Sequence, residues 1–326
     1  MKIVIPGGSG HLGKALADAF VAAGHEVVVL SRSPRTRPGW REVAWDGVSI
    51  GPWAGEVDGA DAVVNLAGRS VNCRYTKANL KEMMDSRVES TRAVGLAIAR
   101  AGRPPAVWLQ MSTATLYAHT FGAANDEASG VIGGAEPGVP ALWRRSIEIA
   151  KAWEAAQAEA DTPRTRKVTL RSAMVMGREA GGVFDLLARL ARFGLGGPLA
   201  GGAQFMSWIH ERDFVRAVAF LIARADLSGP FNLASPNPLP QREFMAAVRA
   251  AGGHRLALPA TRWMLEIGTF LLRTETELIL KSRRVVPARL LEAGFRFEHP
   301  EWPAAARDLL QGSVATSPLR PPRPAA

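Results

Sequence analysis

Residues 3–13 read IVIPGGSGHLG, and this stretch decides the fold of the chain. Residues 3–5 form a short β-branched run that predicts a strand, and the Pro-Gly pair behind them ends that strand. Residues 11–23 then repeat apolar side chains at helical spacing, and residues 27–30 form an apolar run that suits a strand buried on both faces. The order of strand, glycine turn, helix and strand predicts a parallel βαβ unit.

The glycine turn satisfies two spacings at once, with Gly7, Gly10 and Gly13 as GxxGxxG and Gly8, Gly10 and Gly13 as GxGxxG. Three glycines are a weak signal alone, but their place between a strand and a helix is typical of a dinucleotide site. Backbone without side chains can approach a pyrophosphate there, and free N–H groups at the helix start stabilise its charge. A tight turn that binds no ligand is the alternative interpretation.

The end of the second strand indicates which nicotinamide cofactor would fit. An NAD-binding chain usually carries Asp or Glu at this point, where the carboxylate accepts hydrogen bonds from the ribose 2′-hydroxyl. Ser31 and Arg32 stand there instead, and the planar fork of a guanidinium suits the 2′-phosphate of NADPH. Arg32 could also be a solvated surface residue, but the missing carboxylate still disfavours NAD.

Strands and helices alternate along the rest of the chain. Residues 61–68 (DAVVNLAG) predict a buried strand, residues 77–100 a long helix, and residues 107–111 a strand followed by hydroxyl side chains that include Thr113. From Arg171 the predicted strands are shorter and are separated by periodic segments at 183–193, 213–223, 242–250 and 286–291. This alternation predicts an α/β protein with a doubly wound parallel sheet and a smaller C-terminal α/β lobe.

Several blocks of sequence together resemble a known family. The blocks are GGSGHLG, NLAG, KEMMDSRVEST, MSTATLY, RSAMVMG, SWIHERDFVRAV, GPFNLASPNPLPQREF and RRVVPARLLEAGFRF. From Met1 to about Leu310 the chain is similar to the atypical extended short-chain dehydrogenase/reductases, within the NAD-dependent epimerase/dehydratase-like family that carries a DUF1731 C-terminal segment. The resemblance implies a Rossmann fold that binds NADP(H) along the carboxyl edge of its sheet.

Carried onto this chain, the resemblance distributes the cofactor site over several elements. The residues implied at the cofactor are Gly7, Gly10, His11, Leu12, Ser31, Arg32, Leu66, Ala67, Glu82, Arg87 and Val175. Glu82 and Arg87 are poorly spaced for contact with each other on a helix, so separate surface roles stay open for them. The implied division is an NADP-binding domain over 1–170, a substrate-side lobe over 171–311 with a DUF1731-like segment at about 258–310, and a disordered tail over 312–326.

The stretch WRRSIEIAKAWE at residues 143–154 lacks the tyrosine that such reductases usually carry one helical turn before a lysine. In the usual pair, the lysine ammonium stabilises tyrosinate and so lowers the pKa of the proton-donating phenol. One possible register aligns Ile147 and Lys151 with this pair, and a second aligns Ser146 and Ala150. Neither register supplies Tyr and Lys, so another group must exchange the proton.

The predicted catalytic residues are Thr113, Tyr117 and His210. Thr113 matches the hydroxyl residue that orients the substrate oxygen in the family. The chain has 2 tyrosines, so a phenol donor would be Tyr117, whose position is usually structural in the family, or Tyr75, which is predicted to line the substrate pocket. His119, His210 or water could donate the proton instead, since a histidine of near-neutral pKa needs no lysine partner. A hydrogen bond across the domain junction is an equal alternative for His210.

Composition narrows the partners of the chain. The net charge of +10 would allow nucleic-acid binding, but the basic residues are scattered and no basic run is interleaved with aromatic residues. A single cysteine, Cys73, agrees with a reducing compartment, so a cytoplasmic location is expected. No cluster of His, Cys, Asp and Glu has metal-ligand spacing, and no metal site is predicted.

Residues 263–280 are apolar, but charged residues interrupt them, so they are not expected to span a membrane. This segment is predicted to pack on the main domain, to form a homodimer contact or to line a tunnel.

Two functions are compatible with these features. The first is an NADPH-dependent oxidoreductase that acts on a small carbonyl or enone-type substrate, as the cofactor signature and Thr113 indicate. The second is a catalytically weak or inactive NADP(H)-binding regulatory protein, as the lost Tyr-Lys pair indicates. The sequence predicts a small-molecule substrate in the first case, and no membrane or nucleic-acid partner in either.

Overall fold

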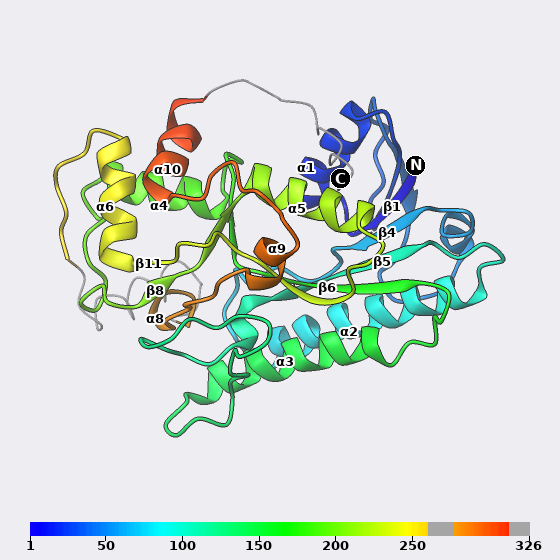
Figure 1. Cartoon of the computed structure of the whole chain (residues 1–326), viewed down its shortest axis with the longest axis horizontal. Helices are drawn as coiled ribbons and strands as arrows, with labels where there is room; N and C mark the ends of the chain where they lie inside the picture. The colour runs from blue at the N-terminus through cyan, green and yellow to red at the C-terminus, as the bar shows by residue number, and fades with distance from the viewer. Residues whose placement is uncertain (260–276, 313–326) are drawn as a thin grey trace.

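The structure is a computed structural model that describes residues 1–259 and 277–312. Its centre is a seven-stranded sheet in which every recorded pairing is parallel (Figure 1). The strand order is β10-β6-β5-β4-β1-β2-β3, with β1 at Lys2–Pro6, β2 at Glu26–Ser31, β3 at Arg41–Ala44, β4 at Ala62–Asn65, β5 at Val107–Thr113, β6 at Arg166–Ser172 and β10 at Gly229–Leu233. Strands β2 and β3 are added on one side of β1 and the later strands on the other, so the strand order reverses between β1 and β4 and the predicted doubly wound sheet is confirmed.

Successive residues of the central strands point to opposite faces of the sheet and fill two separate cores. Ile3 and Ile5 of β1 join the core on one face, and Val4 between them joins the core on the other. Trp108 of β5 shares the core of Val4 and is 0% exposed. Because both faces are covered, these strands are apolar at every position, as the sequence runs predict.

Helices cover both faces of the sheet (Figure 1). α1 (His11–Ala22) and α5 (Glu211–Ala223) pack on the face that holds Ile3, and α2 (Lys77–Arg100) packs on the face that holds Val4. α3 (Ala141–Ala158) lies beside α2, where the Gln157 side chain donates to the Trp108 carbonyl. The helices predicted at 11–23 and 77–100 are therefore confirmed almost residue for residue.

A second, smaller lobe has a core of its own. It contains the helices α4 (Val183–Arg192), α6 (Gln241–Ala251) and α10 (Trp302–Gln311), and the short strands β7 (Met174–Met176), β8 (Phe205–Met206), β9 (Trp208–His210) and β11 (Leu239–Pro240). Trp302 lies at its centre, 0% exposed, with its ring stacked on that of Phe244 at a centroid distance of 3.9 Å. Its indole Nε1 donates to the Phe244 carbonyl at 2.8 Å. The predicted C-terminal α/β lobe is thereby confirmed.

The two lobes exchange segments along the chain. β10 pairs with β6 at the edge of the main sheet, although its sequence follows strands of the second lobe. Leu290 of α9 (Ala288–Glu292) and Phe295 also join the core that α1 covers. The first lobe therefore draws on segments beyond residue 170, where the sequence places the domain boundary, because a later parallel strand closes the edge of β6.

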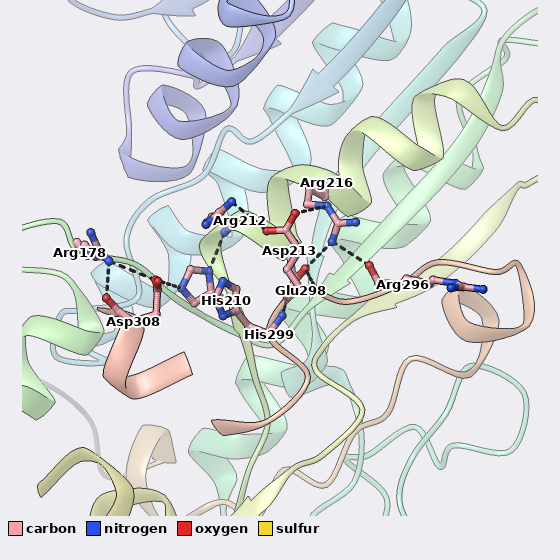
Figure 2. Close-up of polar contacts among 9 residues, drawn as sticks. All are labelled: Arg178, His210, Arg212, Asp213, Arg216, Arg296, Glu298, His299 and Asp308. Atoms are coloured by element: carbon pink, nitrogen blue, oxygen red, sulfur yellow. Dashed lines mark hydrogen bonds and ion pairs between the residues drawn. The ribbon is translucent and has the colours of Figure 1, made fainter. Parts of the chain in front are cut away.

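Asp213 of α5 fastens the chain between α9 and α10 to the first lobe (Figure 2). Its side chain is 0% exposed, with Oδ1 accepting the Glu298 N–H at 2.7 Å and Oδ2 accepting the His299 N–H at 2.8 Å. Arg216 adds a donor at 2.9 Å from Oδ1. A carboxylate that accepts two backbone N–H groups fixes the path of the chain at this point.

Three short helices complete the described elements: η1 (Pro52–Glu56), η2 (Ala114–Leu116) and α8 (Glu277–Leu280). Most of the apolar segment at 263–280, and the predicted tail beyond residue 312, lie outside the described residues. None of the helices in the described ranges is long and apolar enough to cross a bilayer.

Candidate functional site

A cavity of about 420 Å³ opens at the carboxyl ends of the sheet strands. Its lining comes from both lobes and includes Leu12, Leu66, Arg87, Thr113, Ser146 and Val175. In doubly wound sheets, ligands bind in the crevice at this edge, next to the point where the strand order reverses. The cavity is therefore the candidate active site.

The glycine turn at one end of the cavity has two kinds of glycine. Gly7 has a φ of 74°, and a Cβ on it would lie 2.6 Å from Ala67 Cα, while a Cβ on Gly13 would lie 2.3 Å from Gly8 Cα. These positions exclude a side chain because the fold itself leaves no room. Gly10 differs, since the nearest atom to its added Cβ is the Gly7 carbonyl oxygen at 3.8 Å.

The surface in front of Gly10 is therefore open, and α1 begins directly behind it. Gly10 is the N-cap residue of α1, and because glycine has no side chain, no capping side chain accepts from the N–H groups at the helix start. No acidic residue lies in the first turn. The N–H groups of the first helical turn have no intrahelical acceptor, and together with the helix dipole they suit a phosphate.

His11, the first residue of α1, lies between two carboxylates beside this surface. Its Nδ1 lies 2.6 Å from Glu179 Oε2, and its Nε2 lies 2.7 Å from Glu211 Oε2. Both ring nitrogens face carboxylates, so both must carry a proton to donate. The hydrogen bond to Glu211 is the main cause of the raised pKa of His11, which is consistent with an imidazolium ion.

Ser31 and Arg32 lie at the carboxyl end of β2, as the sequence predicts. Ser31 is buried, and its Oγ accepts the Ser33 N–H at 3.3 Å. Arg32 is exposed and forms no ion pair with any residue in the described ranges. Its guanidinium donors are thus available to an anion. Neither residue is among those that line the cavity.

Leu66 and Ala67 follow β4 at the same edge of the sheet. Leu66 lines the cavity. Ala67 is buried, and its N–H donates to Asn65 Oδ1 at 3.0 Å. Asn65 in turn donates from Nδ2 to Gln110 Oε1 at 2.9 Å, which joins the ends of β4 and β5.

The two predicted helical residues occupy different environments. Arg87 lines the cavity, donates to the Met83 and Arg69 carbonyls at 3.0 Å each, and lies over the Trp153 ring. Burial lowers its pKa to about 10, and no carboxylate pairs with it in the described ranges, so a bound anion would compensate its charge. Glu82 is mostly exposed and pairs with Arg69. The structure therefore brings Arg87, and not Glu82, to the cavity.

The structure decides between the two registers of α3. Ser146 and Ala150 line the cavity, whereas Ile147 is 1% exposed and packs with Leu116. Lys151 is exposed. The positions that carry Tyr and Lys in the usual arrangement are thus Ser146 and Ala150 in this chain.

Of the predicted catalytic residues, Thr113 alone lines the cavity. Its Oγ1 accepts the Thr115 N–H at 3.2 Å, so its own proton remains free to be donated. Tyr117 is 2% exposed and lies outside the lining, with its hydroxyl donating to Asn232 Oδ1 at 2.9 Å and accepting from Arg171 at 3.0 Å. This arrangement suits a structural tyrosine and does not suit a proton donor to a substrate.

The two candidate histidines also lie outside the lining of the cavity. His119 accepts the Ser282 N–H on Nδ1 at 2.7 Å and contacts the rings of Phe121 and Trp143. His210 is 3% exposed and acts as the N-cap of α5, where its Nδ1 accepts the Arg212 N–H at 3.1 Å. The placement of His210 matches the predicted alternative of a structural residue at the domain junction.

His210, His299 and Asp308 form a cluster of potential metal ligands (Figure 2). However, Nδ1 of His210 accepts a hydrogen bond, so the neutral ring carries its proton on Nε2, which faces Asp308 Oδ2 at 3.3 Å. The His210 and His299 rings are stacked, with centroids 3.9 Å apart and planes at 24°. The recorded contacts of the cluster are thus ring stacking, the hydrogen bond that His210 Nδ1 accepts and the approach of His210 Nε2 to Asp308.

His210→Ala is expected to lower the free energy of unfolding by about 2–4 kcal/mol, since it removes a helix cap and a buried ring. Burial, then His299, lowers the pKa of His210 below its ordinary value of 6.5. The unfolded chain therefore takes up a proton as pH falls below 6.5 while the folded ring does not, so acid destabilises the protein through this residue.

Urea denaturation at neutral and mildly acidic pH measures both effects. The stability loss should be largest at neutral pH and smaller in acid, where the parent has already lost part of the contribution. His254→Ala, at a partly exposed histidine, is the control and should change little. Equal stability of the His210→Ala and parent proteins at neutral pH would contradict a structural role.

Ser146 and Glu277 line the cavity with Tyr75, and sequence reasoning missed Glu277. The placement of Tyr75 is as predicted. Ser146 Oγ donates to Glu277 Oε2 at 2.6 Å across 131 positions of sequence. No spacing signal in the sequence could have indicated this contact, because Glu277 comes from α8 in the C-terminal segment.

The parallel sheet, its helices on both faces and the glycine turn before α1 define a Rossmann-like α/β protein. Residues 3–234 match the NAD dependent epimerase/dehydratase family, and residues 260–309 match a domain of unknown function, DUF1731. The chain belongs to the NAD dependent epimerase/dehydratase family, and its DUF1731 segment confirms the resemblance found in the sequence.

Known relatives match over nearly the whole chain. The epimerase family protein SDR39U1 of Bos taurus is 32% identical, over 95% of this chain and 100% of its own. The epimerase family protein ML0860 of Mycobacterium leprae is 34% identical, over 91% and 92%. The crystal structure of human SDR39U1 (isoform 2) with NADPH superposes with a TM-score of 0.82 at 29% identity, over 96% of this chain and 100% of that chain.

Proposed function

We propose that this protein binds NADPH and uses it to reduce a small carbonyl or enone-type substrate. The observation that carries the proposal is the cavity itself, which extends from the open start of α1, at His11 and Leu12, to the Thr113 hydroxyl at the end of β5. A nucleotide and a small substrate would lie end to end along such a path. The human SDR39U1 structure with NADPH supports the choice of cofactor.

The residues present fit such a cofactor. The Gly10 surface and the first turn of α1 would hold the pyrophosphate, with Leu66 and Ala67 beside the adenosine and ribose. Arg32, exposed and without an ion pair in the described ranges, would bind the 2′-phosphate together with Ser31. Arg87 would contribute a buried positive charge, and Val175 would border the cofactor from β7.

When bound, NADPH would supply a hydride to the substrate carbon. Thr113 would donate its free proton in a hydrogen bond to the substrate oxygen and so hold that oxygen in place. Ile149 and Trp153 of α3 contribute apolar lining. Apolar walls exclude water and strengthen hydrogen bonds to charge that develops on the oxygen.

A catalytically weak NADP(H)-binding regulator is the second candidate. It is supported by Ser146 and Ala150, which stand where Tyr and Lys would line the cavity. Turnover of a carbonyl substrate that is lost in Thr113→Val would exclude this second function.

Arg32→Ala tests the proposed cofactor. Loss of a charge-assisted contact to phosphate should weaken NADPH binding roughly 10- to 100-fold. NADH lacks the 2′-phosphate, so its affinity should change by less than about twofold. Parallel fluorescence titrations with NADPH and NADH measure both constants.

Arg92→Ala is the matched control, because Arg92 is an exposed arginine in the middle of α2 and its loss removes the same net charge. It should leave NADPH binding unchanged at moderate salt. If the parent bound neither nucleotide, the proposed function would be wrong. If it bound both equally, with or without Arg32, the choice of NADPH would be wrong.

A further inference from the structure

Glu277 is a buried carboxylate in the wall of the cavity. It is 2% exposed and lines the cavity from α8. Its Oε2 accepts the Ser146 hydroxyl at 2.6 Å, whereas its Oε1 accepts no hydrogen bond in the described part of the chain. A carboxylate has about four lone-pair positions, and buried polar groups normally find hydrogen-bond partners. Glu277 therefore keeps unused acceptor capacity in the wall of a ligand cavity.

Lys281 compensates the charge of Glu277 but does not use this capacity. Lys281 Nζ lies 3.9 Å from Glu277 Oε1, which is an ion pair but is beyond hydrogen-bond distance. Lys281 is 1% exposed and donates instead to the Thr115 carbonyl at 2.7 Å. A buried carboxylate needs such a partner charge to offset its desolvation. The pair is thus compensated, while the lone pairs of Oε1 are left to another donor.

Ser146 also presents an acceptor to the cavity that it lines. A serine hydroxyl has one proton and two lone pairs, and the proton of Ser146 is donated to Glu277. Ser146 Oγ can therefore accept a hydrogen bond from a ligand but cannot donate one at the same time. Ser146 and Glu277, here called the acceptor pair, offer a ligand acceptor oxygens alone.

Thr113 supplies the opposite polarity in the same cavity. Its Oγ1 accepts the Thr115 N–H at 3.2 Å, so its proton is available to a ligand. Thr115 is also connected to the acceptor pair, because its carbonyl accepts from Lys281, which pairs with Glu277. One donor and one acceptor pair are thus presented within one cavity and joined through Thr115 and Lys281.

Much of the remaining lining is apolar. It includes the side chains of Val71, Met83, Ile149 and Trp153. Such walls pack well against hydrocarbon or an aromatic ring, but they cannot compensate an additional buried polar group. The ligand that fits has an apolar body, a carbonyl oxygen for Thr113 and an O–H or N–H donor for the acceptor pair.

We propose that Ser146 and Glu277 form a specificity site that binds an O–H or N–H donor of the substrate while Thr113 holds its carbonyl oxygen. The substrate class is then a carbonyl compound with a neighbouring donor group, such as an aryl hydroxyketone. This inference rests on the proposed function and deepens it, because it selects one class among the carbonyl compounds. A ketone without the donor would leave the buried acceptors unpaired, and the site should reject it.

α-Hydroxyacetophenone and α-methoxyacetophenone are the matched probes, because they share the ring and the carbonyl and differ in the donor. Binding is measured by calorimetric titration of the whole chain saturated with NADP⁺, and nicotinamide absorbance is followed to confirm that no hydride is transferred. The parent should bind the hydroxyketone roughly 10- to 100-fold more tightly, as expected of a hydrogen bond to a charged acceptor. Acetophenone controls for the added methyl group and should also bind more weakly than the hydroxyketone.

Glu277→Gln should reduce this preference to less than about threefold. The glutamine side chain keeps the shape, but its amide can donate to Ser146 Oγ and so release the serine proton. Glu148→Gln is the matched control. Glu148 lies on the same helix as Ser146, pairs with Arg145 at 2.7 Å and is outside the cavity lining. Its replacement should keep the parental preference.

Two further variants separate the parts of the site. Ser146→Ala leaves the ion pair of Glu277 and Lys281 in place and should also reduce the preference, so the test does not depend on the stability of Glu277→Gln. Thr113→Val removes the contact that both ketones share. It should weaken both by similar factors and leave their ratio unchanged.

The possible results separate the two proposals. If the parent binds neither NADPH nor NADP⁺, the proposed function is wrong, and the substrate class falls with it. If the parent binds the nucleotide but binds the two ketones equally, or binds neither of them, the acceptor pair does not select the substrate and nucleotide binding stands. A parental preference that persists in both Glu277→Gln and Ser146→Ala would also overturn the specificity site.

Discussion

Gly10→Ala is expected to abolish tight NADPH binding while leaving the protein folded. The backbone of Gly10 is extended, with a φ of −75°, so alanine fits without strain. The nearest atom to the added methyl group would be a carbonyl oxygen at 3.8 Å, which is an ordinary contact. The methyl group would instead fill the surface where the pyrophosphate of the proposed cofactor would approach the backbone, so affinity should fall on the order of 100-fold or more, about 2.7 kcal/mol.

Two other glycines provide the controls. Gly55→Ala places a methyl group where no atom lies within 4 Å, and should change neither stability nor binding. Gly13→Ala would place its Cβ 2.3 Å from Gly8 Cα, and should destabilise the fold itself. NADPH titration and thermal melting of the three variants separate these effects. Parental NADPH affinity in Gly10→Ala would show that no phosphate group approaches this turn.

Trp302→Ala is expected to lower the free energy of unfolding by about 3–5 kcal/mol, as is usual when a large buried aromatic ring is removed. The ring is 0% exposed, stacks on Phe244 and meets the edge of Trp208 at a centroid distance of 4.8 Å. The substitution also leaves the Phe244 carbonyl without its indole donor. The second lobe would lose the residue on which α6 and α10 converge.

Urea denaturation followed by circular dichroism measures this loss. Leu310→Ala is the control in the same helix, because Leu310 is 37% exposed and its truncation should cost less than about 1 kcal/mol. A cost for Trp302→Ala as small as that of the control would mean that the second lobe does not depend on this core.

The main sheet and its first helices could be predicted from the sequence because their signals are local. The apolar runs at 3–5 and 27–30 are buried on both faces, which in a parallel sheet requires no alternation of polar residues. The glycine turn then ends β1 and begins α1 within a few residues. The boundary between the lobes could not be predicted from local signals, because β10 pairs with β6, which precedes it by more than 50 positions.

The face that α3 turns to the cavity could not be read from its sequence alone. Ile147 with Lys151 and Ser146 with Ala150 have the same spacing, and only packing distinguishes them. Ile147 is buried against Leu116, which turns Ser146 toward the cavity. The contact of Ser146 with Glu277 depends on a segment 131 positions away, and no periodic pattern encodes it.

His210 and Tyr117 illustrate a different limit. Both residues lie close in sequence to the predicted site, and both have side chains that can donate protons. The structure uses His210 to begin α5 and uses Tyr117 to join β10 to β6 through Asn232 and Arg171. The type of residue and its position in the sequence therefore indicated candidate proton donors. The orientation of each side chain decides whether it reaches the cavity.

β10, α9 and Phe295 come late in the sequence but pack in the first lobe, and this order affects how the protein folds during translation. A ribosome releases β1 to β6 early, but the sheet face that Phe231, Leu290 and Phe295 cover stays exposed until almost the whole chain has emerged. For most of translation the nascent first lobe thus exposes apolar surface, and it cannot complete its fold as an independent N-terminal unit. Its completion is tied to the synthesis of the C-terminal segment, so prematurely terminated chains would expose an apolar surface to chaperones and proteases.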